Sequence, residues 1–145
     1  KTLLFIGLGG FIGSVSRFIL ARAVQASAMS SFPFGTLTVN IAGCLLLGLI
    51  YGILEKGVLI SPDLRLFLTV GLCGGFTTFS TFSSESFLLL RDGQISHFFI
   101  YTLASIFLCL VAVFTGNLIQ NYSDMQTGNA MRLLKTIVPI LLVLA

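Results

Sequence analysis

The sequence predicts an all-α membrane protein with four transmembrane helices, the third of them broken at its centre. Of the 145 residues, 56% are hydrophobic and only 9% are charged, and the mean hydropathy is +1.05. Soluble domains carry about 25% charged residues, so this chain has too little polar surface to cover a water-soluble globule. Crossing about 30 Å of hydrocarbon takes about 20 apolar residues. Four windows meet that requirement: residues 2–24, 36–54, 64–90 and 98–119.

Four spans enclose little volume, so a polar pathway through this protein requires a second copy, most simply a two-fold homodimer. Without the C-terminal tail, Lys and Arg nearly balance across the predicted membrane: Lys1, Lys56 and Arg65 on one side, Arg22 and Arg91 on the other. Orientation follows the Lys/Arg bias, so such a chain can insert both ways up and form an antiparallel, dual-topology dimer. The net charge of +3 is spread over loops and helix ends, with no basic run suited to nucleic acid.

The first span (2–24) is rich in small residues, and Arg17 follows them on the same helix. The small residues are Gly7, Gly9, Gly10 and Gly13. Glycines at these spacings let helix backbones approach closely in lipid. Arg17 has three interpretations: a snorkelling side chain, an ionic tie between helices, or a positive charge near the mouth of an anion path.

The second span (36–54) follows a short polar turn and brings the amide of Asn40 deep into the bilayer. The amide is either an interhelical hydrogen-bonding group, worth about 0.6 kcal/mol on average, or a donor that faces a pathway. Gly43 and Gly48, further along this span, fit close helix packing.

The third span (64–90) is predicted to be discontinuous, because Gly74 and Gly75 are followed by Thr77 and Thr78. Glycine entropy and β-branching both disfavour regular helix here. A broken helix exposes carbonyls that can bind a small cation, and it usually lines a site or pore near the membrane midplane. Hydroxyl donors cluster at and after the glycine pair: Thr77, Thr78, Ser80, Thr81, Ser83 and Ser84.

Two aromatic rings and one acid follow the predicted break. Phe79 and Phe82 stand three apart, hence on one helical face. Such a pair is ordinarily core packing, but among hydroxyls the positive ring edges can also meet an anion. Glu85 lies about one turn further on, and a carboxyl there is either protonated or bonded to hydroxyls or to Arg17.

The fourth span (98–119) carries Tyr101, Ser105 and Cys109 at intervals of four, so all three project from one face. They are either interhelical bonding groups or part of a polar track. The cysteines Cys44, Cys73 and Cys109 show no paired spacing. Free cysteines inside apolar spans are usually packing residues, so neither disulfides nor metal–thiolate chemistry is expected.

The resulting track is rich in neutral donors and phenyl edges and poor in carboxylates, which favours a small anion over a cation. Fluoride, chloride and formate all stay open on this argument. An enzyme is not expected. The only histidine, His97, lies at a helix edge, so it is not expected to form a Ser–His pair with the serines of the hydroxyl run.

Three motifs give the chain a specific resemblance to the CrcB/Fluc family of fluoride channels, over about residues 1–120. They are Gly9-Gly10-x-x-Gly13-x-x-x-Arg17, Gly35-Thr36-Leu37-x-Val39-Asn40-x-x-Gly43, and Gly71-x-x-Gly74-Gly75-x-Thr77-Thr78-Phe79-Ser80-Thr81-Phe82-Ser83-x-Glu85.

This resemblance implies an antiparallel, dual-topology homodimer with two fluoride pores, in the inner membrane of a microbe, that releases fluoride passively and protects the cell. It further implies a structural Na⁺ on the dimer axis, held by the main-chain carbonyls of Gly74 and Thr77. Arg17 would lie near the aqueous vestibule. The pore would be lined by Thr38, Asn40, Phe79, Ser80, Thr81, Phe82, Glu85, Tyr101 and Ser105.

Two features depart from the family pattern. Cys109 stands where a hydroxyl would be the better donor, and the tail 121–145 extends beyond the usual subunit end and has no assigned role. Among other classes, a small multidrug exporter would carry a glutamate in its first span, where this chain has an arginine. A purely structural subunit would explain the glycines but not hydroxyls clustered at a helix break.

Overall fold

The computed structural model describes the backbone of residues 1–55 and 60–144 and the side chains of residues 1–55 and 60–122. Within these ranges every regular element is a helix. Four segments are long and apolar enough to cross a membrane: Thr2–Ala28, Phe34–Leu54, Pro62–Arg91 and Ile95–Tyr122. Each contains one of the predicted windows, so the prediction of an all-α protein with four spans is confirmed.

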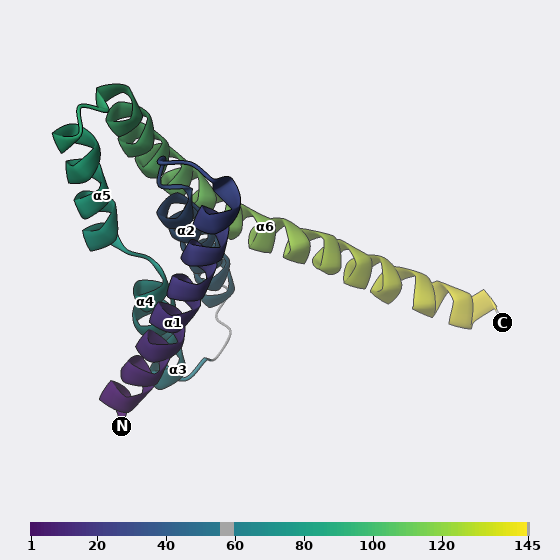
Figure 1. The fold of residues 1–145 in the computed structure, drawn as a ribbon. Helices are drawn as coiled ribbons and strands as arrows, with labels where there is room; N and C mark the ends of the chain where they lie inside the picture. The colour runs from purple at the N-terminus through teal and green to yellow at the C-terminus, as the bar shows by residue number, and fades with distance from the viewer. Residues whose placement is uncertain (56–59, 145) are drawn as a thin grey trace.

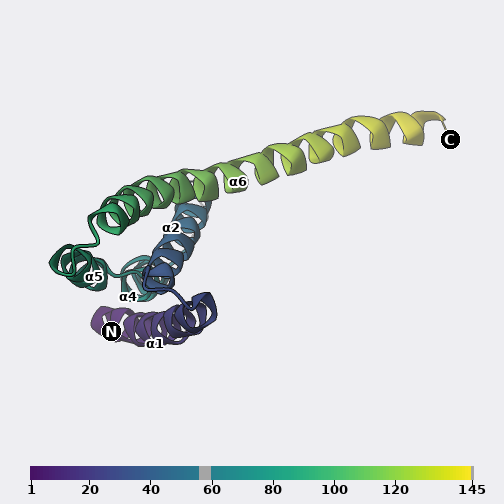
Figure 2. The same cartoon turned by 45° about the horizontal axis from the view of Figure 1, so that its top comes forward.

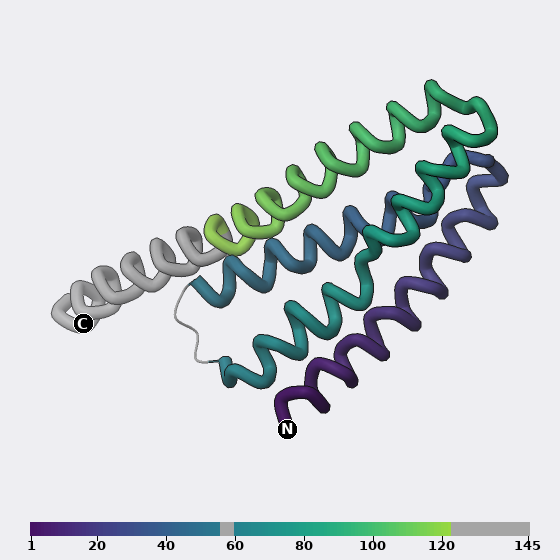
Figure 3. Tube along the Cα trace, turned by 90° about the vertical axis from the view of Figure 1, so that its left-hand side faces the viewer, coloured from purple at the N-terminus to yellow at the C-terminus, as the bar shows by residue number. Residues whose placement is uncertain are grey.

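The helices follow one another along the chain, and the segment Pro62–Arg91 is made from four of them (Figure 1). In Figure 2, α2 lies between α1 and α6, in agreement with its contacts to both. Figure 3 shows α2 and the first part of α6 side by side. The bounds are α1 Thr2–Ala28, α2 Phe34–Leu54, α3 Pro62–Leu66, the π-helix η1 Phe67–Cys73, α4 Gly74–Phe76, α5 Phe79–Arg91 and α6 Ile95–Leu144.

The turn between α1 and α2 is held by the side chain of Gln25. Its Nε2 donates to the carbonyls of Ser30 (2.7 Å) and Phe32 (3.1 Å). Its Oε1 accepts from the amide of Gly35 at 3.0 Å. One amide side chain therefore satisfies three backbone groups of a turn that breaks the helical hydrogen-bond ladder.

Helix α1 packs on η1 and α4 with backbone against backbone. Gly9 and Gly13 are buried, and a Cβ added at Gly9 would lie 2.5 Å from a main-chain oxygen of η1. From the other side, a Cβ at Gly75 would lie 2.7 Å from the Gly10 carbonyl oxygen. A Cβ at Gly7, by contrast, would have no such neighbour within 4 Å. The predicted close approach of this glycine-rich helix is confirmed, and Gly9 and Gly13 are the residues that allow it.

A second close approach joins α2 to α6. A Cβ at Gly48 would collide with the main chain of Val113, and one at Gly116 would collide with the Leu45 carbonyl. The predicted packing role of Gly48 is thereby confirmed. The tail 121–145 begins within α6, but its side chains from residue 123 onward lie outside the described residues, so its role stays unassigned.

Between α4 and α5 the backbone is extended for two residues, as the link in Figure 1 shows. Thr77 has φ −88° and ψ 160°, and Thr78 has φ −151° and ψ 118°. The Thr78 hydroxyl caps α5 by accepting from the amide of Thr81. The link leaves several backbone groups without helical partners, so the surrounding residues must supply them.

Candidate functional site

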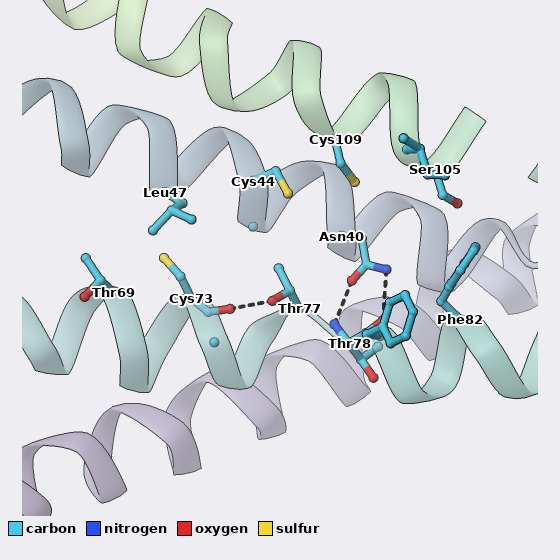
Figure 4. Close-up of a pocket in the computed structure, with 14 residues that line it drawn as sticks. Asn40, Cys44, Leu47, Thr69, Cys73, Thr77, Thr78, Phe82, Ser105 and Cys109 are labelled. Atoms are coloured by element: carbon cyan, nitrogen blue, oxygen red, sulfur yellow. Dashed lines mark hydrogen bonds between the residues drawn. The ribbon is translucent and has the colours of Figure 1, made fainter. Parts of the chain in front are cut away.

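A cavity of about 340 Å³ lies beside the extended link, between α2, α6 and the two halves of Pro62–Arg91 (Figure 4). We call it the central cavity. Its lining includes six residues that the resemblance assigns to the pore or to the sodium ion: Asn40, Gly74, Thr77, Phe79, Phe82 and Ser105. Residues far apart in the chain thus meet in one place.

Asn40 braces the extended link. Its Oδ1 accepts from the Thr78 amide at 2.7 Å, and its Nδ2 donates to the Thr78 carbonyl at 3.1 Å (Figure 4). This two-point pairing replaces the helical bonds that Thr78 lacks, so the interhelical interpretation of Asn40 is confirmed. The amide nitrogen carries a second N–H bond, and Asn40 also lines the central cavity.

The same contacts free two carbonyl groups. In an unbroken α-helix each carbonyl accepts from the amide four residues later. For Gly74 that amide belongs to Thr78, which donates to Asn40 instead. For Thr77 it belongs to Thr81, which donates to the Thr78 hydroxyl at 3.2 Å. The oxygens of Gly74 and Thr77 therefore lose their helical donors, which fits them to serve as cation ligands.

Arg17 ties α1 to the first half of Pro62–Arg91. Its Nε donates to the carbonyl of Gly75 at 3.2 Å, and the contact is partly buried. The tie is a hydrogen bond to main chain rather than an ion pair. Of the three interpretations of Arg17, the interhelical tie matches this geometry.

Phe79 and Phe82 lie together at the start of α5. Their ring centroids are 5.7 Å apart at an interplanar angle of 39°, and Phe82 also packs on Tyr101 with a centroid distance of 5.1 Å. Phe79 is 79% exposed, although its ring helps to line the central cavity. The predicted shared face is confirmed, and one ring of the pair is anchored while the other is open on its outer side.

Glu85 is bonded to hydroxyls, one of the alternatives that the sequence left open. The Thr36 hydroxyl donates to its Oε1 at 2.8 Å and the Tyr101 hydroxyl to its Oε2 at 2.7 Å. Thr36 and Glu85 line a second cavity of about 310 Å³, which also includes Gln25 and Gln94; we call it the polar cavity. Arg17 plays no part, since it is bonded to Gly75.

Tyr101 and Ser105 lie one turn apart on one face of α6. Tyr101 is fully buried and bonds Glu85 at the polar cavity. Ser105, one turn later, lines the central cavity, and its buried Oγ has no hydrogen-bond partner among the described residues. Cys109 is a further turn along and lines the same cavity. The predicted stripe on this helix face is confirmed.

Three predicted pore residues lie elsewhere. Thr38 lines a separate cavity beside the end of α1. The Thr78 hydroxyl donates to Thr81 Oγ1 at 3.0 Å and lies 3.3 Å from Ser80 Oγ, so these hydroxyls gather around the link. Thr78 lines the central cavity, whereas Ser80 and Thr81 are not among its lining residues. Thr36, which the sequence analysis did not assign to the pore, bonds Glu85 and lines the polar cavity. Its spacing of four from Asn40 was the available signal, because it puts both on one face of α2.

Comparison with known proteins gives a consistent result. The family model described as "CrcB-like protein, Camphor Resistance (CrcB)" matches residues 4–117. A fluoride-specific ion channel FluC of Flavobacterium psychrophilum is 48% identical over 119 residues, covering 82% of this chain and 96% of that protein. A protein of the same name from Geobacter sulfurreducens is 49% identical over 115 residues, covering 79% and 93%.

A third protein with that name, from Phocaeicola vulgatus, is 47% identical over 116 residues, covering 80% of this chain and 95% of the relative. Together with the four apolar spans, these relatives place the chain in a microbial cell membrane as a multi-pass protein. The matches extend over nearly the whole of each relative, and the range of the family model, residues 4–117, includes every residue of both cavities. The chain therefore belongs to the CrcB family.

Proposed function

We propose that this chain forms a fluoride-selective channel through which fluoride leaves the cell passively, so that the cell is protected from fluoride toxicity. The similar proteins named above are fluoride-specific ion channels and not enzymes. The observation that carries the proposal is the buried Ser105 hydroxyl, which has no hydrogen-bond partner among the described residues and lines a cavity together with Asn40 and two phenyl rings.

A small anion stripped of water needs several closely spaced donors. The central cavity offers the Ser105 hydroxyl, the remaining N–H of Asn40 and the positive ring edges of Phe79 and Phe82. No Asp or Glu is among its lining residues in the described part of the chain. The polar cavity continues this route through Tyr101 and Thr36, whose hydroxyls both bond Glu85.

The complete channel is an antiparallel, dual-topology homodimer with two pores. Phe79 is 79% exposed at the edge of the central cavity, so one chain leaves an aromatic wall of this cavity open. A second copy closes that wall with its own surface. The near balance of Lys and Arg across the membrane supports insertion in both directions.

The segment Pro62–Arg91 crosses the bilayer in two halves that meet at Thr77 and Thr78. The freed carbonyls of Gly74 and Thr77 from both subunits hold a structural Na⁺, for which main-chain oxygens are suitable ligands. The ion supplies positive charge that stabilises the two facing links. The neighbouring carbonyl of Gly75 already accepts a hydrogen bond from Arg17, so it is not assigned to the ion.

The direct test is fluoride efflux from liposomes that contain the purified protein, read with a fluoride electrode and compared with chloride efflux. We expect rapid efflux that is selective for fluoride. Equal rates for the two anions, or no flux from a folded dimer, would refute the proposed function.

Two further measurements address the assembly. The mass in detergent should be that of two chains, and an Asp92→Cys substitution in the α5–α6 loop should be labelled from both sides of the membrane. Labelling from one side only would contradict dual topology. Replacing Na⁺ with a large organic cation should lower the melting temperature, and an unchanged value would argue against the ion.

A further inference from the structure

Three thiols converge on the central cavity. Cys44 comes from α2, Cys73 from η1 and Cys109 from α6, and all three line the cavity (Figure 4). All three are free. Their wide separation along the chain hid this arrangement from the sequence, which predicted only packing roles.

Cys44 and Cys109 are the two thiols that the packing of α2 on α6 brings to the same level of the central cavity. Gly48 and Val113, which lie in main-chain contact, stand one turn after Cys44 and Cys109 respectively. Because the two helices are in such close contact at Gly48 and Val113, the thiols one turn earlier on each helix lie at the same level.

The third thiol, Cys73, lines the same cavity but does not complete a larger site. Among the described residues, no group of three or more His, Cys, Asp or Glu side chains is arranged to hold one metal ion. The chemistry available is therefore that of two thiols. Soft ligands of this kind select soft, thiophilic cations.

We propose that Cys44 and Cys109 bind one mercuric ion as a linear dithiolate inside the central cavity, and that the bound ion obstructs the anion route. The reaction is HgCl₂ + 2 RSH → Hg(SR)₂ + 2 H⁺ + 2 Cl⁻. Two mercury–sulfur bonds replace two mercury–chlorine bonds, and each thiol releases one proton. No oxidant or reductant is required.

The charge of the product favours mercury over other soft cations. A divalent ion with two thiolates is neutral, whereas Ag⁺ or Cu⁺ with two thiolates would leave one negative charge. Isolated charge within the membrane is costly. Neutral HgCl₂ is moreover suited to entering an apolar region that hydrated cations do not reach.

The site lies next to the donors on which the proposed function rests. Asn40 is one turn before Cys44 on α2, and Ser105 is one turn before Cys109 on α6, with all four in the same cavity. An ion bridging the two sulfurs occupies space between the same two helices. The effect on flux depends on the proposed function, whereas binding of the ion does not.

Binding is tested by X-ray absorption at the mercury edge, on reduced protein with one equivalent of mercuric acetate in chloride-free buffer. We expect two sulfur neighbours in the unmodified chain and in Cys73→Ser, which leaves the pair intact. Cys44→Ser and Cys109→Ser should each show one sulfur and one lighter ligand. One sulfur in the unmodified chain, or two in either of these last variants, would overturn the proposed site.

Obstruction is tested by fluoride efflux with and without HgCl₂, and each variant is compared with its own untreated rate. The unmodified chain and Cys73→Ser should lose at least about tenfold in rate, while Cys44→Ser and Cys109→Ser keep most of theirs. Equal inhibition of all four proteins would overturn the obstruction. Absence of efflux before mercury is added would refute the proposed channel function and leave the absorption result to decide the binding site.

Discussion

The two halves of the segment Pro62–Arg91 are attached to the rest of the chain in different ways. In the first half, η1 and α4 lie against α1 with main chain on main chain, and the contacts leave no room for a Cβ at Gly75. In the second half, α5 is attached by side chains, through the hydroxyls on Glu85 and the ring contact of Phe82 with Tyr101.

This difference separates a scaffold from a site. Backbone contacts fix position but offer little chemistry, and they tolerate almost no change in size. Side-chain contacts present donors and ring edges, and a substitution there changes the chemistry while the helices stay in place. We therefore expect mutations in the first half to act on stability and mutations in the second half, or on its partners, to act on conduction.

The largest expected effect is that of Gly75→Val in the first half. Its Cβ would lie 2.7 Å from the carbonyl oxygen of Gly10, so α1 must move away, at a cost of about 3 kcal/mol or more. We expect loss of monodisperse protein in size-exclusion chromatography and a much lower melting temperature. Gly7→Ala is the matched control, since a Cβ there meets nothing within 4 Å. If both variants behave alike, the backbone contact is not what holds the halves together.

Asn40→Asp should have the next largest effect, on conduction. Aspartate keeps the acceptor for the Thr78 amide but loses the donor to the Thr78 carbonyl, and its charge repels an anion. Hydrogen bonds to charged groups contribute about 1.5–3 kcal/mol, so fluoride efflux should fall by roughly 10- to 100-fold. Retained efflux would mean that Asn40 only braces the link.

Phe79→Ile and Phe82→Ile should each preserve the fold and reduce fluoride efflux by about tenfold. Isoleucine fills similar space but has no positive ring edge, a difference worth about 0.5–1.5 kcal/mol for aromatic contacts. Phe87→Ile is the control, because that ring lies on the same helix and is 63% exposed outside the cavity. Unchanged flux in both test variants would refute the hypothesis that the ring edges of Phe79 and Phe82 contact fluoride.

The smallest predicted effect distinguishes two threonines of α2. Thr36→Val removes the hydroxyl that donates to Glu85, a loss of about 1 kcal/mol, so efflux should fall by roughly fivefold. Thr38→Val should leave efflux unaltered, since Thr38 lies at a different cavity. The opposite ranking would place the route along the other face of α2.

Features that depend on hydropathy and residue size were predictable from the sequence. Four spans follow from the length of the apolar windows, and the close approach of α1 follows from its glycines. The hydrogen-bond partners of polar groups were harder to predict, because Asn40 pairs with the backbone of Thr78, which is 38 residues away. The assignment of Thr38 to the pore stays a prediction: the residue is two positions from Asn40, on nearly the opposite side of the helix, and lines a different cavity. The proximity of Cys44 and Cys109 depends on how α2 packs against α6, and no local sequence pattern predicts that packing.

The pairing of Asn40 with Thr78 also has a consequence for biosynthesis. Thr78 presents bare peptide groups that lipid cannot satisfy, so this part of the chain is unfavourable in a bilayer until its partner is present. The partner is encoded 38 residues earlier, and the ribosome therefore delivers α2 to the membrane before the link emerges. The order of residues in the gene thus matches the order in which the pieces are needed, and a circular permutant that synthesises Pro62–Arg91 first would have to insert the link without its brace.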